Sequence, residues 1–468
     1  MNYPLEPSPG AMRAMGDAAL SFLLSFLEGL PEAPSFNTES ARELARELRG
    51  SAPEDGGSFD DVLQTFVLAA SKVNETAGPG YLAYIPGGGL FSAAVADFLA
   101  AGTNRFVNLW AQAPALVQME NDVVRWLCDL FAFPPGSRGI LTSGGSLANF
   151  SAVVTARKDR LPEDFLKGTL YVSHQVHASV TKAASLAGFP LGNIRRVACT
   201  PELRMDVEAL RSALRADRSA GLQPFCVIPS AGTTNTGAVD PLEAIADVAA
   251  EEELWMHVDA AYGGFFHLTE RGRERFVGIE RADSITLDPH KGMFLPYGVG
   301  ALVVRDGEKL RDAHYSGAAY LQDLPGEDEL PNFAEYSPEL SRDFRGLRVW
   351  LPLKLHGVSA FREALDEKLD LARVLYEGLR EIPGLEVPWE PDLTTVPFRV
   401  AEGADGDPNT LTQQLLDRIN ASKRVFLSST MLDGRFTIRP CILSHRTHRD
   451  RIDEALDITA KSAAEILS

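Results

Sequence analysis

Hydrophobic positions recur at helical spacing through the N-terminal part of the chain. Between residues 41 and 73 they keep this spacing on both sides of a break at 53–58, and residues 18–30 read as an amphipathic helix. That stretch is too short to cross a membrane and is interrupted by Glu28. We predict an N-terminal helical segment over residues 1–88 that packs on another surface.

The hydrophobic pattern changes in the middle of the chain. Between about Ile140 and Val304, short β-rich runs alternate with helical ones, and the runs read RGILTSGG, TLYVS, PFCVIPSAG, LWMHVDAAY, DSITLD and GVGALVVR. Such alternation is typical of βαβ units and predicts a mainly parallel sheet. We assign residues 89–350 to this large α/β domain.

The last third of the chain begins with an acidic stretch rich in Pro and Gly, residues 315–344, which indicates a long loop of the kind that often forms a mobile lid. A helical stretch then runs to about Arg380. Strand-like VPFRV, a helix over 409–422, strand-like RFTIRP and a final helix follow. This order predicts a smaller α+β domain over residues 351–468.

Composition narrows the class of protein. The chain has 468 residues, 45% of them hydrophobic and 23% charged, which is ordinary for a soluble globular protein of two or three units. A net charge of -19 argues against a nucleic-acid or anionic-membrane partner. The four cysteines, Cys128, Cys199, Cys226 and Cys441, have no spacing suited to a metal site or a disulfide framework, which favours a reducing, cytoplasmic setting.

Two motifs follow strand-like runs and carry reactive side chains. In DPHKG, Lys291 lies where ligands of α/β sheets bind, and a neutral lysine amine there can form a Schiff base with an aldehyde cofactor. A solvated surface lysine is the alternative. In HVDAAYGG, Asp259 could hold a pyridine nitrogen protonated, or could simply cap a helix.

Three further motifs end strands of the same predicted sheet. In TSGGS, glycines and hydroxyls at a helix N-terminus could bind a phosphate, although a plain turn has the same pattern. HQVHASV offers His174 and His177 for an aromatic ring or a proton, and SAGTTNTG offers hydroxyls. Because the carboxyl ends of parallel strands meet at one edge, these five segments together predict one site.

These motifs resemble those of the group II, or aromatic-L-amino-acid-type, pyridoxal-phosphate-dependent decarboxylases, over residues 80–446. HVDAAYGG and DPHKG, in this order and separation, are the most specific, supported by TSGGSLAN, HQVHASV and SAGTTNTGAVDP. The resemblance implies the aspartate-aminotransferase-like fold (PLP-dependent transferase fold type I), pyridoxal 5'-phosphate (PLP) as cofactor, and a homodimer. It also implies release of carbon dioxide from an L-amino acid.

The resemblance assigns roles to residues. Lys291 would bind the cofactor covalently, Asp259 would partner its pyridine nitrogen and His177 would stack on its ring. Further cofactor contacts fall on Gly145, Ser146, Thr234, Ala261 and His290, and on Asp288, which stands where many relatives have Asn. Among tyrosines of the 315–344 loop, Tyr336 is the predicted proton donor to the substrate carbon, with Tyr315 and Tyr320 as alternatives. Arg439 would lie near the substrate carboxylate.

The residues that resemble the family's side-chain pocket are mostly apolar: Tyr84, Pro86, Phe106, Leu109 and Trp110. A buried acidic side chain without a positive partner is costly, so we expect an aromatic or large aliphatic substrate. Arg105 keeps an acidic amino acid open. The same cofactor could instead support oxidative deamination to an aldehyde, an aminotransferase or another lyase reaction. A non-catalytic protein of this fold is the remaining alternative.

Overall fold

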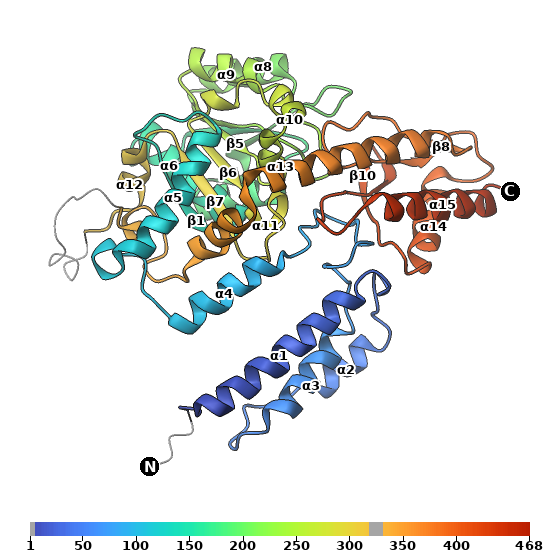
Figure 1. The fold of residues 1–468 in the computed structure, drawn as a ribbon. Coiled ribbons are helices and arrows are strands. Elements are labelled where there is room, and N and C mark those ends of the chain that lie inside the picture. Colours follow the sequence, from blue (N-terminus) through green and yellow to red (C-terminus); the bar gives the residue numbers. More distant parts are fainter. Residues whose placement is uncertain (1–4, 318–330) are drawn as a thin grey trace.

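The computed structural model describes residues 5–317 and 331–468. Its N-terminal helices α1 (Pro9–Gly29), α2 (Ala41–Glu47) and α3 (Phe59–Ala70) form an arm that projects from the main body, and α4 (Phe91–Thr103) lies along that body (Figure 1). Helix α1 begins well before residue 18, because the Ser8 side chain caps its first turn and Pro9 occupies the first helical position. Within the predicted segment 1–88, helices therefore occupy Pro9–Gly29, Ala41–Glu47 and Phe59–Ala70.

The main body is built on a seven-stranded sheet of order β1-β7-β6-β5-β4-β2-β3. Only β7 runs antiparallel to its neighbours, so the predicted mainly parallel sheet is confirmed. Sequence reasoning missed β3. The strands are β1 (Arg138–Thr142), β2 (Gly168–Ser173), β3 (Ile194–Val197), β4 (Gln223–Ile228), β5 (Trp255–Asp259), β6 (Ser284–Leu287) and β7 (Gly300–Val304).

Helices cover both faces of the sheet and bury two hydrophobic cores against it. One core takes side chains from α5, α8, α9 and α13, and the other from α6, α7 and α12. This three-layer arrangement is what nearly continuous apolar strands require, since both of their faces must be covered. The helices are α5 (Pro114–Leu130), α6 (Gly145–Arg160), α7 (Ala178–Leu186), α8 (Val207–Ser219), α9 (Leu242–Glu251), α10 (Glu270–Arg275), α11 (Pro289–Gly292) and α12 (Gly307–His314).

Helix α13 (Arg345–Arg380) connects the main body to a smaller C-terminal unit, and the predicted boundary at residue 350 falls inside it. The unit contains β8 (Leu385–Glu386), β9 (Arg399–Val400), α14 (Pro408–Ala421), β10 (Ser428–Leu432), β11 (Arg435–Arg439) and α15 (Arg449–Ile466) around a third core. Strand-like VPFRV contributes only the two residues of β9. Within the described ranges, no helix is long and apolar enough to cross a membrane.

Candidate active site

The carboxyl ends of the strands meet at one edge of the sheet, and the turns after them enclose a cavity of about 360 Å³. A smaller space adjoins it and shares three of its lining residues, His177, Ala261 and Lys291. Turns after β1, β2, β4, β5 and β6 all contribute. The two spaces are lined by Ser143, Gly144, Gly145, Ser146, His177, Ser179, Ser230, Gly232, Thr233, Thr234, Asp259, Ala261, Tyr262, Asp288, His290, Lys291, Tyr297 and Gly298.

Lys291 lies on the short helix α11 directly after the buried strand β6. Its side chain is about one-fifth exposed, and Nζ lies 2.9 Å from Oδ2 of Asp288. Burial disfavours the charged amine, but the opposite charge of Asp288 outweighs burial and holds the pKa of Lys291 above its ordinary value. The amine must lose its proton before it can attack an aldehyde.

Asp259 ends β5 and is almost fully buried. Its Oδ1 accepts a hydrogen bond from the backbone N–H of Ala261 (3.2 Å), and its Oδ2 accepts one from the side-chain amide of Asn149 (3.1 Å). The carboxylate is therefore held in one orientation beside the cavity that Lys291 enters. A fixed, buried carboxylate can keep a pyridine nitrogen protonated, which a loosely held one would do poorly.

His177 is the N-cap residue of α7, and its Nδ1 accepts the backbone N–H of Ser179 at 3.2 Å. This hydrogen bond helps to orient the His177 ring, which lines the cavity. His174, the other histidine of the motif, lies outside the residues that line the cavity. The structure therefore brings together Lys291, Asp259 and His177, as the sequence predicted.

Gly145 and Ser146 begin α6 at the other end of the cavity, where helix N–H groups and the positive end of the helix dipole favour a phosphate. A Cβ atom on Gly145 would lie 3.0 Å from the Asp288 carboxylate and 3.2 Å from Cβ of Ala261, so the close approach favours glycine. His290 donates from Nδ1 to the carbonyl of Val299 at 2.6 Å, which leaves Nε2 toward Asp288.

The lining residues fit PLP. A helix N-terminus suits its phosphate, a buried carboxylate suits its pyridine nitrogen, and a lysine amine suits its aldehyde. One carboxylate oxygen, Oδ1 of Asp288, is buried without a hydrogen-bond partner among the described residues. Asp288 pairs with Lys291 and lies 3.7 Å from Nε2 of His290, whose pKa is lowered by burial, so its charge faces the Lys291 amine. That arrangement disfavours a direct contact between Asp288 and an anionic phosphate.

The pairing of Asp288 with Lys291 predicts how the cofactor-free protein captures PLP. Replacing Asp288→Asn removes the charge that raises the pKa of Lys291, so more amine is neutral near pH 7.5. Covalent capture should become faster, by roughly tenfold for each pKa unit lost. In the unaltered protein, the capture rate should rise with pH. The measurement is the growth of absorbance near 400 nm after PLP is mixed with cofactor-free protein, with roughly that wavelength expected of a lysine-bound cofactor.

Asp159→Asn is the matched control, because Asp159 pairs with Lys309 at 3.0 Å and neither lines the cavity. It should leave capture unchanged. Equal or slower capture by Asp288→Asn would contradict the assigned role of the ion pair.

The predicted substrate residues do not line this cavity within one chain: Tyr84, Pro86, Phe106, Leu109 and Trp110. Pro86 and Leu109 are buried, whereas Tyr84 is 60% exposed and Phe106 is 41% exposed. In one chain, the side chains of Tyr84 and Phe106 therefore lie at the surface rather than in this cavity.

Arg439 makes several hydrogen bonds within the chain, and its expected place near the substrate carboxylate stays a prediction. Its guanidinium is buried and donates to the carbonyls of Tyr84, Thr234 and Asn235 and to the Ser428 hydroxyl. Four of its five N–H groups are thus used inside the protein. Arg439 therefore ties the Tyr84 segment to the turn that carries Thr234.

Tyr336 does not reach the cavity within one chain. Its ring packs in the hydrophobic core between α6 and α12, is 9% exposed, and has its pKa raised by burial. Tyr315 is 56% exposed at the end of α12. Tyr320 lies outside the described residues. The assignment of a tyrosine as proton donor therefore stays a prediction.

Sequence reasoning missed Asn149, Ser179 and Tyr297. Tyr297 lines the cavity beside His290, with ring centroids 5.7 Å apart. Asn149 and Ser179 are buried polar residues next to Asp259 and His177. Asn149 stands four residues after Gly145, one helical turn further along the chain. Residues four apart share one face of a helix, so this spacing could have indicated that Asn149 faces the same site as Gly145.

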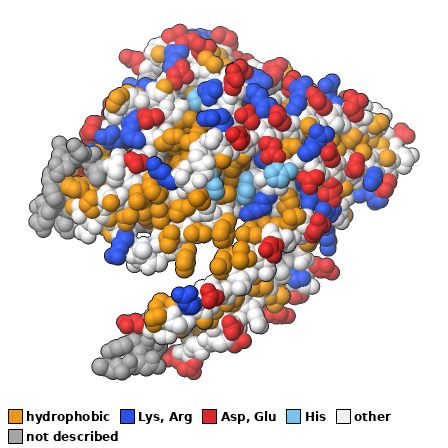
Figure 2. All heavy atoms as spheres, in the orientation of Figure 1, with side chains coloured by type: hydrophobic (Ala, Val, Ile, Leu, Met, Phe, Trp, Pro, Cys, Tyr) orange, Lys and Arg blue, Asp and Glu red, His pale blue; other side chains and the backbone are white. Residues whose placement is uncertain are grey.

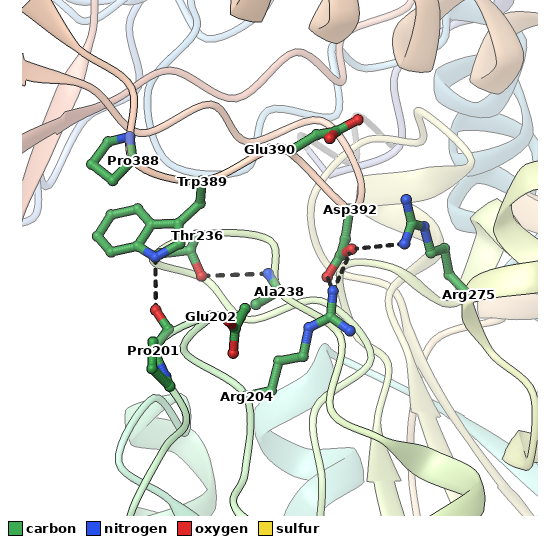
Figure 3. A pocket seen from close by; sticks show the side chains of 10 residues that line it. All are labelled: Pro201, Glu202, Arg204, Thr236, Ala238, Arg275, Pro388, Trp389, Glu390 and Asp392. Atoms are coloured by element: carbon green, nitrogen blue, oxygen red, sulfur yellow. Dashed lines mark hydrogen bonds and ion pairs between the residues drawn. The ribbon is translucent and has the colours of Figure 1, made fainter.

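A second cavity, of about 390 Å³, lies apart from Lys291 at the junction of the large and small units (Figure 3). Asp392, from the small unit, pairs there with Arg204 at 2.9 Å and with Arg275 at 3.3 Å. The Trp389 indole donates to the carbonyl of Pro201. These contacts join the two units, and the lining residues of this cavity include no lysine or histidine.

Comparison with known proteins agrees with this site. Residues 42–401 match the pyridoxal-dependent decarboxylase conserved domain. The chain is 36% identical to an aromatic-L-amino-acid decarboxylase of Bacillus atrophaeus, over 99% of this chain and 97% of that protein. A phenylacetaldehyde synthase of Arabidopsis thaliana is 26% identical over 97% of this chain and 96% of its own length.

Among solved structures, the crystal structure of Oryza sativa TDC with PLP and tryptamine superposes with a TM-score of 0.93. It is 26% identical and covers 100% of both chains. The chain therefore belongs to the pyridoxal-dependent decarboxylase family. It has the fold type I architecture, and its cofactor is PLP.

Proposed function

We propose that this protein decarboxylates an aromatic or large apolar L-amino acid to the corresponding amine. The observation that carries the proposal is the convergence of Lys291, Asp259 and His177 on one cavity in a chain of this family. The preference for aromatic substrates is supported by the relative named an aromatic-L-amino-acid decarboxylase and by the complex with tryptamine. Measuring carbon dioxide release across the common amino acids tests it.

Individual residues of this chain would bind and orient the cofactor. When bound, PLP supplies a ring that accepts the electrons left behind as the carboxylate departs. Lys291 would hold the cofactor covalently through its side-chain amine. Asp259 would keep a proton on the pyridine nitrogen, and the N–H groups of Gly145 and Ser146 would hold the phosphate, with His290 beside them. Thr234 and Ala261 would border the ring.

His177 lines the same cavity as Asp259 and Lys291 and would cover the ring face, where it would orient the departing carboxylate. A tyrosine would then return a proton to the substrate carbon. Tyr336 was the predicted donor, but its ring is buried in the core of its own chain. Tyr315 and Tyr320 are the remaining candidates.

An aldehyde-forming reaction is the second candidate, because a phenylacetaldehyde synthase is among the similar proteins. That reaction consumes oxygen and yields peroxide and ammonia, whereas simple decarboxylation yields an amine. Assaying peroxide and amine alongside carbon dioxide separates the two. An acidic substrate is disfavoured by the apolar character of the residues at 84–86 and 106–110.

We also propose that two copies of the chain form a homodimer through the N-terminal arm. Helices α1 and α3 bury none of their residues in a single chain, and α4 buries only Ala93 and Ala96. Figure 2 shows hydrophobic side chains gathered on the facing sides of the arm and the main body. The large hydrophobic side chains that α1, α3 and α4 leave exposed in one chain include Leu20, Leu23, Leu24, Val62, Phe66, Phe98 and Leu99.

In a dimer, a second copy would cover this apolar face and stabilise the position of the arm, because α1 and α3 bury no residues against their own chain. It could also bring Phe106 and Trp110 toward the partner's cavity, since these residues follow α4.

The four cysteines of the chain are free, which supports our proposal of a reducing, cytoplasmic setting for the protein.

The dimer proposal predicts the effect of charge on the apolar face. Phe98→Asp replaces a side chain that is 73% exposed in one chain and, in the proposed dimer, buries a carboxylate without a partner. Light scattering should show the mass of one chain for this variant and of two for the unaltered protein. Leu186→Asp, at a 67% exposed position on α7, is the matched control and should stay dimeric. A monomeric unaltered protein would contradict the proposal.

A further inference from the structure

Asn149, on α6, makes three hydrogen bonds from a side chain that is 1% exposed. Its Nδ2 donates to Oδ2 of Asp259 at 3.1 Å and to the Ser179 hydroxyl at 3.0 Å. Its Oδ1 lies 3.0 Å from Nε2 of His257. A flipped amide would point its oxygen at the Asp259 carboxylate, two acceptors together, so this orientation is the one that satisfies every atom.

The protons on the His257 side of the amide can be assigned one by one. The Trp255 indole can only donate, and it donates to the Ser284 hydroxyl at 2.8 Å. The Ser284 hydroxyl then gives its own proton to Nδ1 of His257, also at 2.8 Å. Burial lowers the pKa of His257 to about 4, so the ring is neutral and carries its proton on Nε2. That proton faces the Asn149 oxygen at 3.0 Å, and the Thr286 hydroxyl lies farther from the same nitrogen, at 3.3 Å.

The protons on the other side follow in the same way. Because the Ser179 hydroxyl accepts from Asn149, its own proton is available to Nδ1 of His177, 2.8 Å away. The backbone N–H of Ser179 also points at this nitrogen. Nδ1 of His177 is therefore an acceptor, which places the ring proton on Nε2.

We propose that Asn149 is a positioning residue that joins Asp259 and His177 into one hydrogen-bonded unit. Its Nδ2 donates to Oδ2 of Asp259 and so fixes the carboxylate that would partner the pyridine nitrogen. Through the Ser179 hydroxyl it adds a second donor to Nδ1 of His177, beside the Ser179 backbone N–H, and so reinforces the tautomer that presents Nε2–H to the cavity. The inference rests on the proposed reaction, since it matters to turnover only if Asp259 and His177 act as described above.

The test compares four variants of the full-length protein: Asn149→Leu, Ser179→Ala, both together, and Thr155→Val. The dissociation constant of PLP is measured by absorbance titration, and kcat is measured at saturating PLP. Asn149→Leu should weaken PLP binding and lower kcat, each by roughly ten- to a hundredfold, the loss typical when a partner that orients a ligating group is removed. Ser179→Ala should lower kcat while PLP affinity stays within about threefold, under 1 kcal/mol.

The double variant gives the sharpest outcome. If Asn149 reaches His177 only through Ser179, adding Ser179→Ala to Asn149→Leu should change kcat by no more than about twofold, a strongly non-additive result. The proposal would be overturned if the loss of kcat in the double variant equalled the product of the losses in the two single variants. It would also be overturned if Asn149→Leu left both PLP affinity and kcat unaltered. A role confined to stability would lower the melting temperature without this coupling.

Thr155→Val is the matched control. Thr155 is also buried on α6, but its hydroxyl bonds only to the Ser151 carbonyl of the same helix. It should leave PLP affinity and kcat unchanged. If Asn149→Leu does not fold, Ser179→Ala decides alone, and an unchanged kcat there overturns the inference. Failure of the unaltered protein to release carbon dioxide would reject the proposed function, whereas the PLP titrations still report on the Asp259 contact.

Discussion

Lys291→Ala is expected to abolish covalent binding of the cofactor and to reduce decarboxylation by at least about a thousandfold, because it removes the only lysine amine among the described residues that line the cavity. The unaltered protein with PLP should absorb near 400 nm, roughly where a lysine-bound cofactor absorbs. This band should be missing from the variant after dialysis. Reduction with borohydride followed by peptide mass analysis should locate the cofactor on the peptide that contains Lys291.

Lys309→Ala is the control for this experiment, because Lys309 is a partly buried lysine that also pairs with a carboxylate but lines neither space of the site. It should keep the band and the activity. A Lys291→Ala protein that retains a borohydride-stable cofactor would show that a different amine carries it.

Asp259→Asn is expected to have the second largest effect. The amide that replaces the carboxylate cannot balance the positive charge of a protonated pyridine nitrogen, so the ring becomes a poorer electron acceptor. We expect kcat to fall by about a thousandfold, which corresponds to about 4 kcal/mol of transition-state stabilisation. Lys291 remains in place, so the absorbance of the lysine-bound cofactor should still form. Steady-state kinetics and the absorption spectrum together make the measurement.

Asp240→Asn is the matched control for the loss of a buried carboxylate. Asp240 accepts the backbone N–H groups of Met205 and Ser230, and burial raises its pKa to about 6. It lies outside the residues that line the cavity. The control should lower the melting temperature and leave kcat within about threefold, under 1 kcal/mol. If Asp240→Asn lowered kcat as much as Asp259→Asn does, the proposed role of Asp259 at the pyridine nitrogen would be contradicted.

The order of apolar runs predicted the sheet and its functional edge, because each buried parallel strand leaves a continuous hydrophobic run followed by a turn. Strand β3 was missed since its sequence, Ile194 to Val197, contains two arginines. It lies at the edge of the sheet, where Arg195 extends to pair with Asp217 at 2.7 Å. An edge strand needs only alternate residues buried, and a run of four gives too short a pattern.

The site was predicted where the chemistry sits on strand ends and missed where it depends on contacts between distant segments. Lys291, Asp259, His177 and the Gly145 turn each follow a strand, so sequence order places them together. Arg439 contacts carbonyls more than 200 residues away in the sequence, and no local pattern reveals that its donors are already used.

The substrate side of the site was predicted from apolar segments that a single chain leaves partly exposed. Tyr84 and Phe106 resemble pocket residues, yet neither lines the cavity of its own chain. Under the proposed homodimer these surfaces are completed by a second copy, which sequence periodicity does not specify. The hydrogen bonds of Asn149 were likewise invisible, because helical spacing predicts which face is buried but not which polar atoms meet there.

The most direct test of the central claim is a product assay with purified protein and PLP. Carboxyl-labelled L-tryptophan, L-tyrosine, L-phenylalanine, L-glutamate and L-aspartate are supplied separately, and carbon dioxide, amine, aldehyde and peroxide are measured. We expect carbon dioxide and amine in equal amounts from at least one aromatic substrate, without peroxide. Aldehyde with peroxide as the main products, or faster release from glutamate or aspartate, would contradict the account.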